Sequence, residues 1–259
     1  TDIESQNYNH NNYFKNNSYV SVIIFIIYSM SYFGGIIFFN DSLSLKSTSP
    51  DYFPLYFSIF DNDCNDIRYQ IWRLESYSLV HSSFTHYFCN FLLFVIYSNI
   101  IERMNGHYSI FAFFYGIFFG ALSFVSFKPY TKLIGSSGGI YAIYGSYLSS
   151  ILINFKEYNK NINIIMIFNV FLVFFISIID FIYFYNENIG YEAHLFGFIS
   201  GHLISIISIK PIKSYKYHKI LKYYAHTLNI LLLFYFIYNF IKLPNIKNKK
   251  YENKSCYNF

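Results

Sequence analysis

The chain has 259 residues, of which 54% are hydrophobic, 24% aromatic and only 13% charged. A water-soluble domain carries about a quarter of charged residues, so this composition, with a mean hydropathy of +0.29, is typical of a membrane protein. The net charge is +5, with the lysines mostly in loops and in the tail, and this pattern does not indicate nucleic-acid binding.

Hydrophobic runs long enough to cross about 30 Å of hydrocarbon recur along the chain. Lipid cannot hydrogen-bond free backbone groups, so each run is predicted to be a helix. We expect six spans and a seventh, over residues 19–39, 79–100, 108–127, 138–155, 162–184, 193–209 and 224–241. The predicted fold class is therefore all-α, a polytopic helix bundle integral to a membrane that the sequence does not identify.

The predicted organisation has five parts. A polar N-terminal segment and a six-helix core with a long first loop (40–78) are followed by a basic loop, a seventh helix and a basic tail; the parts cover residues 1–18, 19–209, 210–223, 224–241 and 242–259. Spans two, four and six run in the same direction, so their N-terminal ends meet on the side of the long loop. The loops that follow these three spans carry basic residues and are expected to face the cytosol or its equivalent. Three cysteines without metal-like spacing, Cys64, Cys89 and Cys256, are expected to be free thiols.

The segment Gly135-Ser136-Ser137-Gly138 opens span four. Its second serine is a candidate nucleophile, because glycine lets the backbone approach a substrate and a helix N-terminus offers unpaired N–H groups to an oxyanion. On its own this pattern is equally typical of a flexible turn with a helix-capping serine. The interpretation depends on partners elsewhere in the chain.

Polar residues near the start of spans two and six supply such partners. His86 and Asn90 are four residues apart and share a helix face, and His194 lies at the start of span six. Because spans two, four and six are parallel, these three side chains are predicted to lie in the same half of the bundle as Ser137. This is what a buried serine hydrolase requires, and with only Glu192 nearby we expect a Ser–His dyad.

The remaining intramembrane polar residues are interpreted as structural. His202 and His226 are expected to form interhelical hydrogen bonds, His81 to be a structural group at a helix end, and Asp180 to be structural or to lie at the outer interface.

Three further residues are expected to support the dyad. Gly197 and Gly201 form a small-residue pair that lets span six pack closely on span four, which would bring His194 to Ser137. Tyr141 lies one helical turn after Ser137, where its ring can brace the imidazole.

Residues 68–201 resemble the rhomboid family of intramembrane serine proteases. Each motif is weak alone, but five occur in the family's order: Trp72-Arg73 in the first loop; His81, His86 and Asn90; Glu102; Gly135-Ser136-Ser137-Gly138 with Tyr141; and His194 with Gly197 and Gly201. The resemblance implies a six-helix core plus a seventh helix, a Ser137–His194 catalytic dyad, and an oxyanion hole that contains His86 and Asn90.

The resemblance also implies a class of substrate and a reaction that needs no cofactor. The expected partner is the transmembrane helix of a single-span membrane protein in the lipid bilayer, cut near small residues, without a metal or organic cofactor. A non-catalytic rhomboid-like binder or chaperone of membrane proteins is the alternative. A channel or transporter is a second alternative, but it predicts ionisable residues through the full depth of the bundle, whereas here they are concentrated in one half.

Overall fold

The computed structural model describes residues 17–38, 66–129, 131–183 and 189–242, and these are mostly helical. Cys64, Cys256, most of the N-terminal segment and nearly all of the tail lie outside the described residues. The helices are α2 (Tyr19–Phe38), α3 (Arg73–Ser76), η2 (Tyr77–Leu79), α4 (Phe84–Asn105), η3 (His107–Ile110), α5 (Phe111–Phe127), α6 (Ser137–Asn154), α7 (Lys160–Tyr183), α8 (Tyr191–Ser208) and α9 (Lys216–Lys242).

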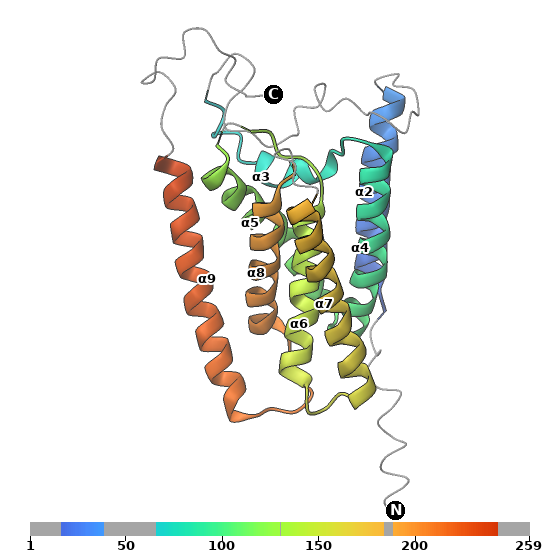
Figure 1. The fold of residues 1–259 in the computed structure, drawn as a ribbon, viewed down its shortest axis with the longest axis vertical. Coiled ribbons are helices and arrows are strands. Elements are labelled where there is room, and N and C mark those ends of the chain that lie inside the picture. The colour runs from blue at the N-terminus through green and yellow to red at the C-terminus, as the bar shows by residue number, and fades with distance from the viewer. Residues whose placement is uncertain (1–16, 39–65, 130, 184–188, 243–259) are drawn as a thin grey trace, which may run out of the picture.

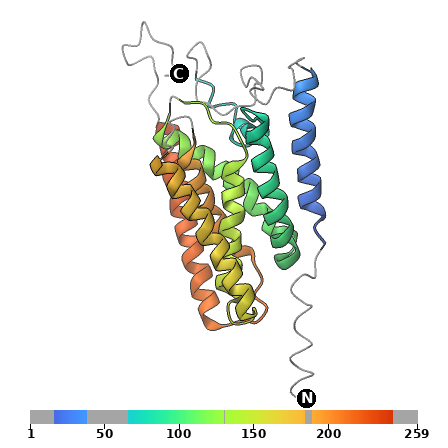
Figure 2. The ribbon, with the colours of Figure 1, turned by 45° about the vertical axis from the view of Figure 1, so that its right-hand side comes forward.

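The long helices form one bundle in which α6 and α8 lie centrally, with α2 and α9 at opposite edges (Figure 1). Figure 2 again shows α2 beside α4, at the edge away from α9. Helices α4, α6 and α8 all begin at the upper end of Figure 1, and the connections α6–α7 and α8–α9 lie at the lower end. The predicted all-α membrane helix bundle is confirmed.

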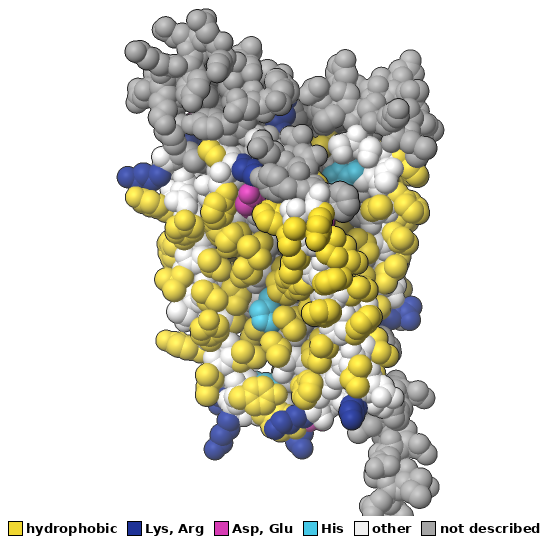
Figure 3. All heavy atoms as spheres, viewed as in Figure 1, with side chains coloured by type: hydrophobic (Ala, Val, Ile, Leu, Met, Phe, Trp, Pro, Cys, Tyr) yellow, Lys and Arg dark blue, Asp and Glu magenta, His cyan; other side chains and the backbone are white. Residues whose placement is uncertain are grey.

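The outer helices carry the apolar surface that lipid requires. Four helices, α2, α4, α7 and α9, are long and apolar enough to cross a membrane, and between 11% and 28% of the residues in their apolar windows are buried in the protein. Hydrophobic side chains cover most of the middle of the face shown in Figure 3, and basic side chains lie along its lower edge. The protein is therefore an integral multi-pass membrane protein.

The central helices are held together by close backbone contact. A Cβ atom placed on Gly197 of α8 would lie 2.3 Å from the carbonyl oxygen of Gly138, and one on Gly201 would lie 2.3 Å from the carbonyl oxygen of Ala142. Gly145 of α6 makes the reciprocal contact, since its Cβ would lie 2.2 Å from the carbonyl oxygen of Phe198. The small-residue packing of span six on span four is thus present over about two turns of helix.

Two helix boundaries differ from the prediction. Helix α9 begins at Lys216, inside the segment predicted as a basic loop, because its first two turns carry exposed lysines at the membrane edge and a hydropathy window detects only the apolar part. Helix α4 begins at Phe84 and not at residue 79, because Ser83 caps it by accepting a hydrogen bond from the backbone N–H of His86.

The lower end of α4 is joined to the start of α2 through a buried carboxylate. Glu102 is fully buried and accepts hydrogen bonds from the backbone N–H groups of Val20 and Ser21, at 3.0 and 2.9 Å, and from the hydroxyl of Ser21. The first N–H groups of a helix have no intrahelical partner, so this carboxylate acts as a cap supplied by a neighbouring helix. His107 contacts the same carboxylate at 2.6 Å.

Candidate active site

Ser137 is the first residue of α6, and a strained turn places it there. Gly135 has φ +98°, a conformation that favours glycine, and its backbone N–H donates to the carbonyl oxygen of Tyr77 at 3.1 Å. A Cβ atom on Gly135 would lie 2.7 Å from Cε1 of His86, so a side chain here would also collide with the imidazole. The turn therefore brings the N-terminus of α6 against α4.

His194 reaches Ser137 from the first turn of α8. Nε2 of its ring lies 2.8 Å from Oγ of Ser137, so the hydroxyl donates to Nε2 when the ring carries its proton on Nδ1. Gly197, one turn after His194 on α8, contacts Gly138, the residue that follows Ser137, and this contact sets the spacing of the N-terminal ends of α6 and α8. The structure thus brings together two residues that are 57 positions apart in the chain.

The imidazole of His194 lies between two aromatic rings. The ring of Tyr141 is stacked on it, with centroids 4.4 Å apart and an interplanar angle of 10°. Tyr191 approaches from another side in an edge-on arrangement, with centroids 6.2 Å apart and an angle of 79°. The bracing by Tyr141 has the geometry that the sequence predicts, whereas the contact of Tyr191 has no counterpart in the predicted motifs.

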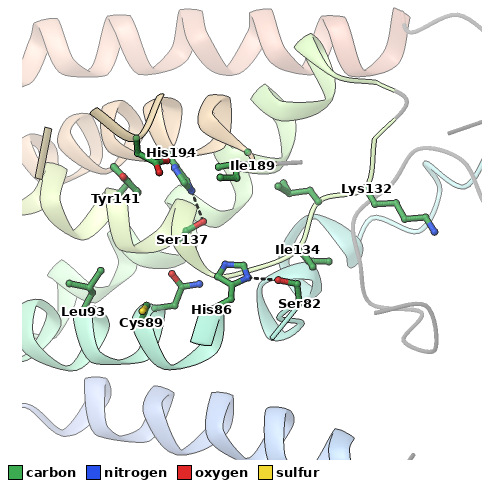
Figure 4. A pocket seen from close by; sticks show the side chains of 14 residues that line it. Ser82, His86, Cys89, Leu93, Lys132, Ile134, Ser137, Tyr141, Ile189 and His194 are labelled. Atoms are coloured by element: carbon green, nitrogen blue, oxygen red, sulfur yellow. Dashed lines mark hydrogen bonds between the residues drawn. The ribbon is translucent and has the colours of Figure 1, made fainter. Parts of the chain in front are cut away.

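His86 faces Ser137 from α4, on the side away from His194 (Figure 4), and Asn90 of the same helix lines the same cavity. Nδ1 of His86 lies 3.1 Å from the hydroxyl of Ser82. Asn90 is buried, with 8% of its surface exposed, and its Nδ2 atom has no hydrogen-bond partner among the described residues. Such a buried amide donor is available to donate to a hydrogen-bonding group that enters the cavity.

These residues line a cavity of about 690 Å³. Its wall is formed by residues of α4, of the turn that precedes α6, and of α6, α7 and α8. Several residues of the cavity wall belong to none of the predicted motifs: Ser82, Cys89, Leu93, Lys132, Ile134 and Ile189. Cys89 and Leu93 lie three and seven residues after His86, so extending the helical face of His86 and Asn90 by one turn identifies both. No comparable signal exists for Ile189, which precedes α8.

Other predicted residues lie near the site or away from it. His81 supports the turn, since its Nε2 lies 3.3 Å from the hydroxyl of Ser136. Trp72 is 53% exposed, and Arg73 is buried with its Nε donating to Gln70 at 2.6 Å. Neither of the two, nor Glu102 at the opposite end of α4, is among the residues that line the cavity.

Three residues interpreted as structural have different outcomes. His202 is confirmed as an interhelical partner, with Nδ1 2.8 Å from the hydroxyl of Ser149 on α6. His226 is exposed on α9, because its position faces away from the neighbouring helices. Asp180 accepts a hydrogen bond from the hydroxyl of Tyr191 at 3.0 Å and also lines the cavity.

The fold and this site define a class of protein: a polytopic membrane helix bundle with a serine–histidine pair in a cavity at one end. A rhomboid domain model matches residues 68–211, which is more than half of the chain. The chain therefore belongs to the rhomboid family.

Individual relatives match parts of the chain. Rhomboid-related protein 2 of Mus musculus is 32% identical over 95 residues, which cover 36% of this chain and 32% of that protein. "Putative rhomboid protease YdcA" of Bacillus subtilis is 28% identical over 145 residues, covering 54% of this chain and 68% of that protein. "Inactive rhomboid-related protein 2" of Caenorhabditis elegans is 23% identical over 161 residues, covering 58% and 44%.

Proposed function

We propose that this chain is a serine endopeptidase that cuts single-span membrane proteins within or next to their transmembrane helix. The observation that carries the proposal is the 2.8 Å contact between Oγ of Ser137 and Nε2 of His194, inside a cavity of a membrane-embedded bundle. A nucleophile within hydrogen-bond distance of a base, with the base oriented by a third group, is the arrangement that covalent catalysis requires. Here the third group is the ring of Tyr141.

In the proposed reaction His194 accepts the proton of the Ser137 hydroxyl while Oγ attacks the carbonyl carbon of the scissile peptide bond. The C–N bond then breaks, His194 gives its proton to the leaving amine, and an acyl-enzyme remains. Water attacks the ester with His194 again acting as base, which releases the new carboxyl end and restores the serine. The proposed steps use only groups of this chain and water.

The negative charge on the carbonyl oxygen needs donors that are already in place. Nδ2 of Asn90 is a buried donor without a partner among the described residues, the ring of His86 also lines the cavity, and the backbone N–H of Ser137 precedes the first intrahelical hydrogen bond of α6. Donors that are fixed before the charge develops stabilise it without reorganisation. We therefore assign the oxyanion-hole role to Asn90, His86 and the backbone N–H of Ser137.

Asn90→Leu is expected to lower kcat by about 100-fold with little change in KM, because it removes one oxyanion donor and retains the size of the side chain. Steady-state cleavage of a single-span model substrate measures both constants. Asn99→Leu is the matched control: Asn99 lies on the same helix, donates to the hydroxyl of Ser18 at 2.9 Å and is remote from the cavity. An Asn90→Leu protein with unchanged kcat would remove Asn90 from the oxyanion hole.

The proposed substrate is an extended stretch of a transmembrane helix. An intact helix has its carbonyl groups in intrahelical hydrogen bonds, so the segment must unwind before Ser137 reaches a carbonyl carbon. The cavity lies at the end of the bundle where α4, α6 and α8 begin, and its wall contains Lys132 and Ser82. Small residues near the cleavage site are expected from the family resemblance.

The alternative is a non-catalytic rhomboid protein that binds transmembrane helices, and one relative of this chain is named as inactive. A serine-directed fluorophosphonate probe separates the two proposals. We expect it to label Ser137 covalently, with labelling lost in His194→Ala, because an unactivated serine does not react with the probe. A folded protein that the probe leaves unlabelled would support the binder.

A further inference from the structure

The upper half of α7 meets the residues around His194 through two polar contacts, and the ring of Phe181 lies edge-on to Tyr191 with centroids 5.1 Å apart. The buried residues of this helix, Asn163, Met166 and Val170, all lie in its first half, and from Phe171 onward no described residue of α7 is buried. In that exposed half, Ser177 and Asp180 are three residues apart and share a helix face. Each of them contacts the hydroxyl group of a tyrosine.

These two tyrosines, Tyr141 and Tyr191, are the ones whose rings contact His194. The hydroxyl of Tyr141 lies 2.6 Å from Oγ of Ser177. Because the single hydroxyl proton of Ser177 is donated to the carbonyl oxygen of Val173 at 2.7 Å, Tyr141 is the donor in this pair. Tyr191 donates to Oδ2 of Asp180 at 3.0 Å. One face of α7 therefore fixes the far ends of the two rings that border the imidazole.

We propose that Ser177 and Asp180 are positioning residues that orient His194 through Tyr141 and Tyr191. The inference rests on the proposed function, because the orientation of the imidazole matters only if Nε2 acts on Ser137. The stacked ring of Tyr141 and the edge-on ring of Tyr191 leave His194 little freedom to rotate, and each ring is held at its hydroxyl by α7. The seating of α7 thereby sets the orientation of the base.

The kinetic test compares Ser177→Ala/Asp180→Leu with a matched control. The double variant is expected to lower kcat about tenfold with KM unchanged, because the substrate still binds while the imidazole loses its fixed orientation. Tyr97→Phe is the control: it also removes a tyrosine hydrogen bond to α7, at 3.2 Å to Asn169, but Tyr97 does not contact His194. Asp180→Asn is expected to recover most of the kcat that Asp180→Leu loses, because its amide oxygen still accepts from Tyr191.

A second readout is independent of catalysis. In protein with isotope-labelled histidine rings, the resonance of His194 is displaced by the ring current of the stacked Tyr141, and it is assigned by its loss in His194→Gln. The double variant is expected to shift or broaden this resonance, whereas Tyr97→Phe leaves it in place. An unchanged resonance in a folded double variant, or a kcat loss of the same size in Tyr97→Phe, overturns the proposal. If the resonance shifts and Ser137→Ala still cleaves the substrate fully, positioning by α7 stands and Ser137 is excluded as the nucleophile.

Discussion

Ser137→Ala and His194→Ala are each expected to lower cleavage of a single-span membrane substrate by more than about 1,000-fold, the scale seen when one member of a catalytic pair is removed. Alanine at position 137 removes the atom that attacks the carbonyl carbon, and alanine at 194 removes the base that lies 2.8 Å from it. Because the two side chains act on the same step, the double variant is expected to lose about as much as either single variant. Product formation in proteoliposomes measures the rates.

Ser136→Ala is the matched control for this experiment. Ser136 is the neighbouring serine in the same turn, and its hydroxyl lies 3.3 Å from Nε2 of His81 and not near His194 in any described contact. We expect this variant to lose about 1 kcal/mol of stability without losing the reaction, since the hydroxyl of Ser136 is buried and hydrogen-bonded to His81. Thermal unfolding in detergent establishes that each variant is folded. Retained cleavage in a folded Ser137→Ala protein would exclude the proposed nucleophile.

The proximity of Ser137 and His194 could be predicted from the sequence because a membrane imposes strict alternation on the helices. Spans four and six run in the same direction, so residues at their N-terminal ends lie at the same depth. Equal depth does not by itself make two helices neighbours. The small residues Gly197 and Gly201 predict that spans four and six pack against each other. Their contacts with the backbone of α6 place the two N-termini side by side.

Other parts of the site carry no signal in the sequence. The hydrogen bond between Tyr191 and Asp180 joins the start of α8 to the end of α7, and the chain is rich in tyrosines that have no such role. Residues 73–79 form α3 and η2 within the predicted long loop, where burial raises the pKa of Glu75 to about 8. A short helix under a loop depends on tertiary contacts, and neither a hydropathy window nor a motif identifies it.

Mean hydropathy underestimates the tendency of the central helices, α6 and α8, to lie within the membrane. Neither α6 nor α8 is among the helices apolar enough to be identified as a span from composition, and both are rich in serine and glycine. Most residues of α6 are buried by its neighbours, and lipid therefore sets few constraints on its composition. Some of the serine hydroxyls donate to backbone carbonyls of the preceding turn, as Ser200 does to Gly197 at 3.0 Å. The two helices that carry Ser137 and His194 thus have a weaker membrane signal than α4 and α7.

Gly201→Ala is expected to destabilise the fold by about 3 kcal/mol, the upper range for overpacking a tight core. The added Cβ would lie 2.3 Å from the carbonyl oxygen, 2.4 Å from Cα and 2.5 Å from Cβ of Ala142, so the backbone of α6 would have to move. Moving α8 away from α6 also withdraws His194 from Ser137, and we expect activity to fall together with stability. Denaturant titration in mixed micelles measures the free energy of unfolding.

The same substitution elsewhere in the chain provides the comparison. Gly34 lies on α2, and a Cβ atom placed on it would have no heavy atom within 4 Å. Gly34→Ala is expected to leave stability unchanged or slightly higher, because alanine has the better helix propensity and meets no steric obstacle. Equal stability of the two variants would mean that α6 and α8 are not in the contact described, and the 2.8 Å distance between Ser137 and His194 would then lose its structural basis.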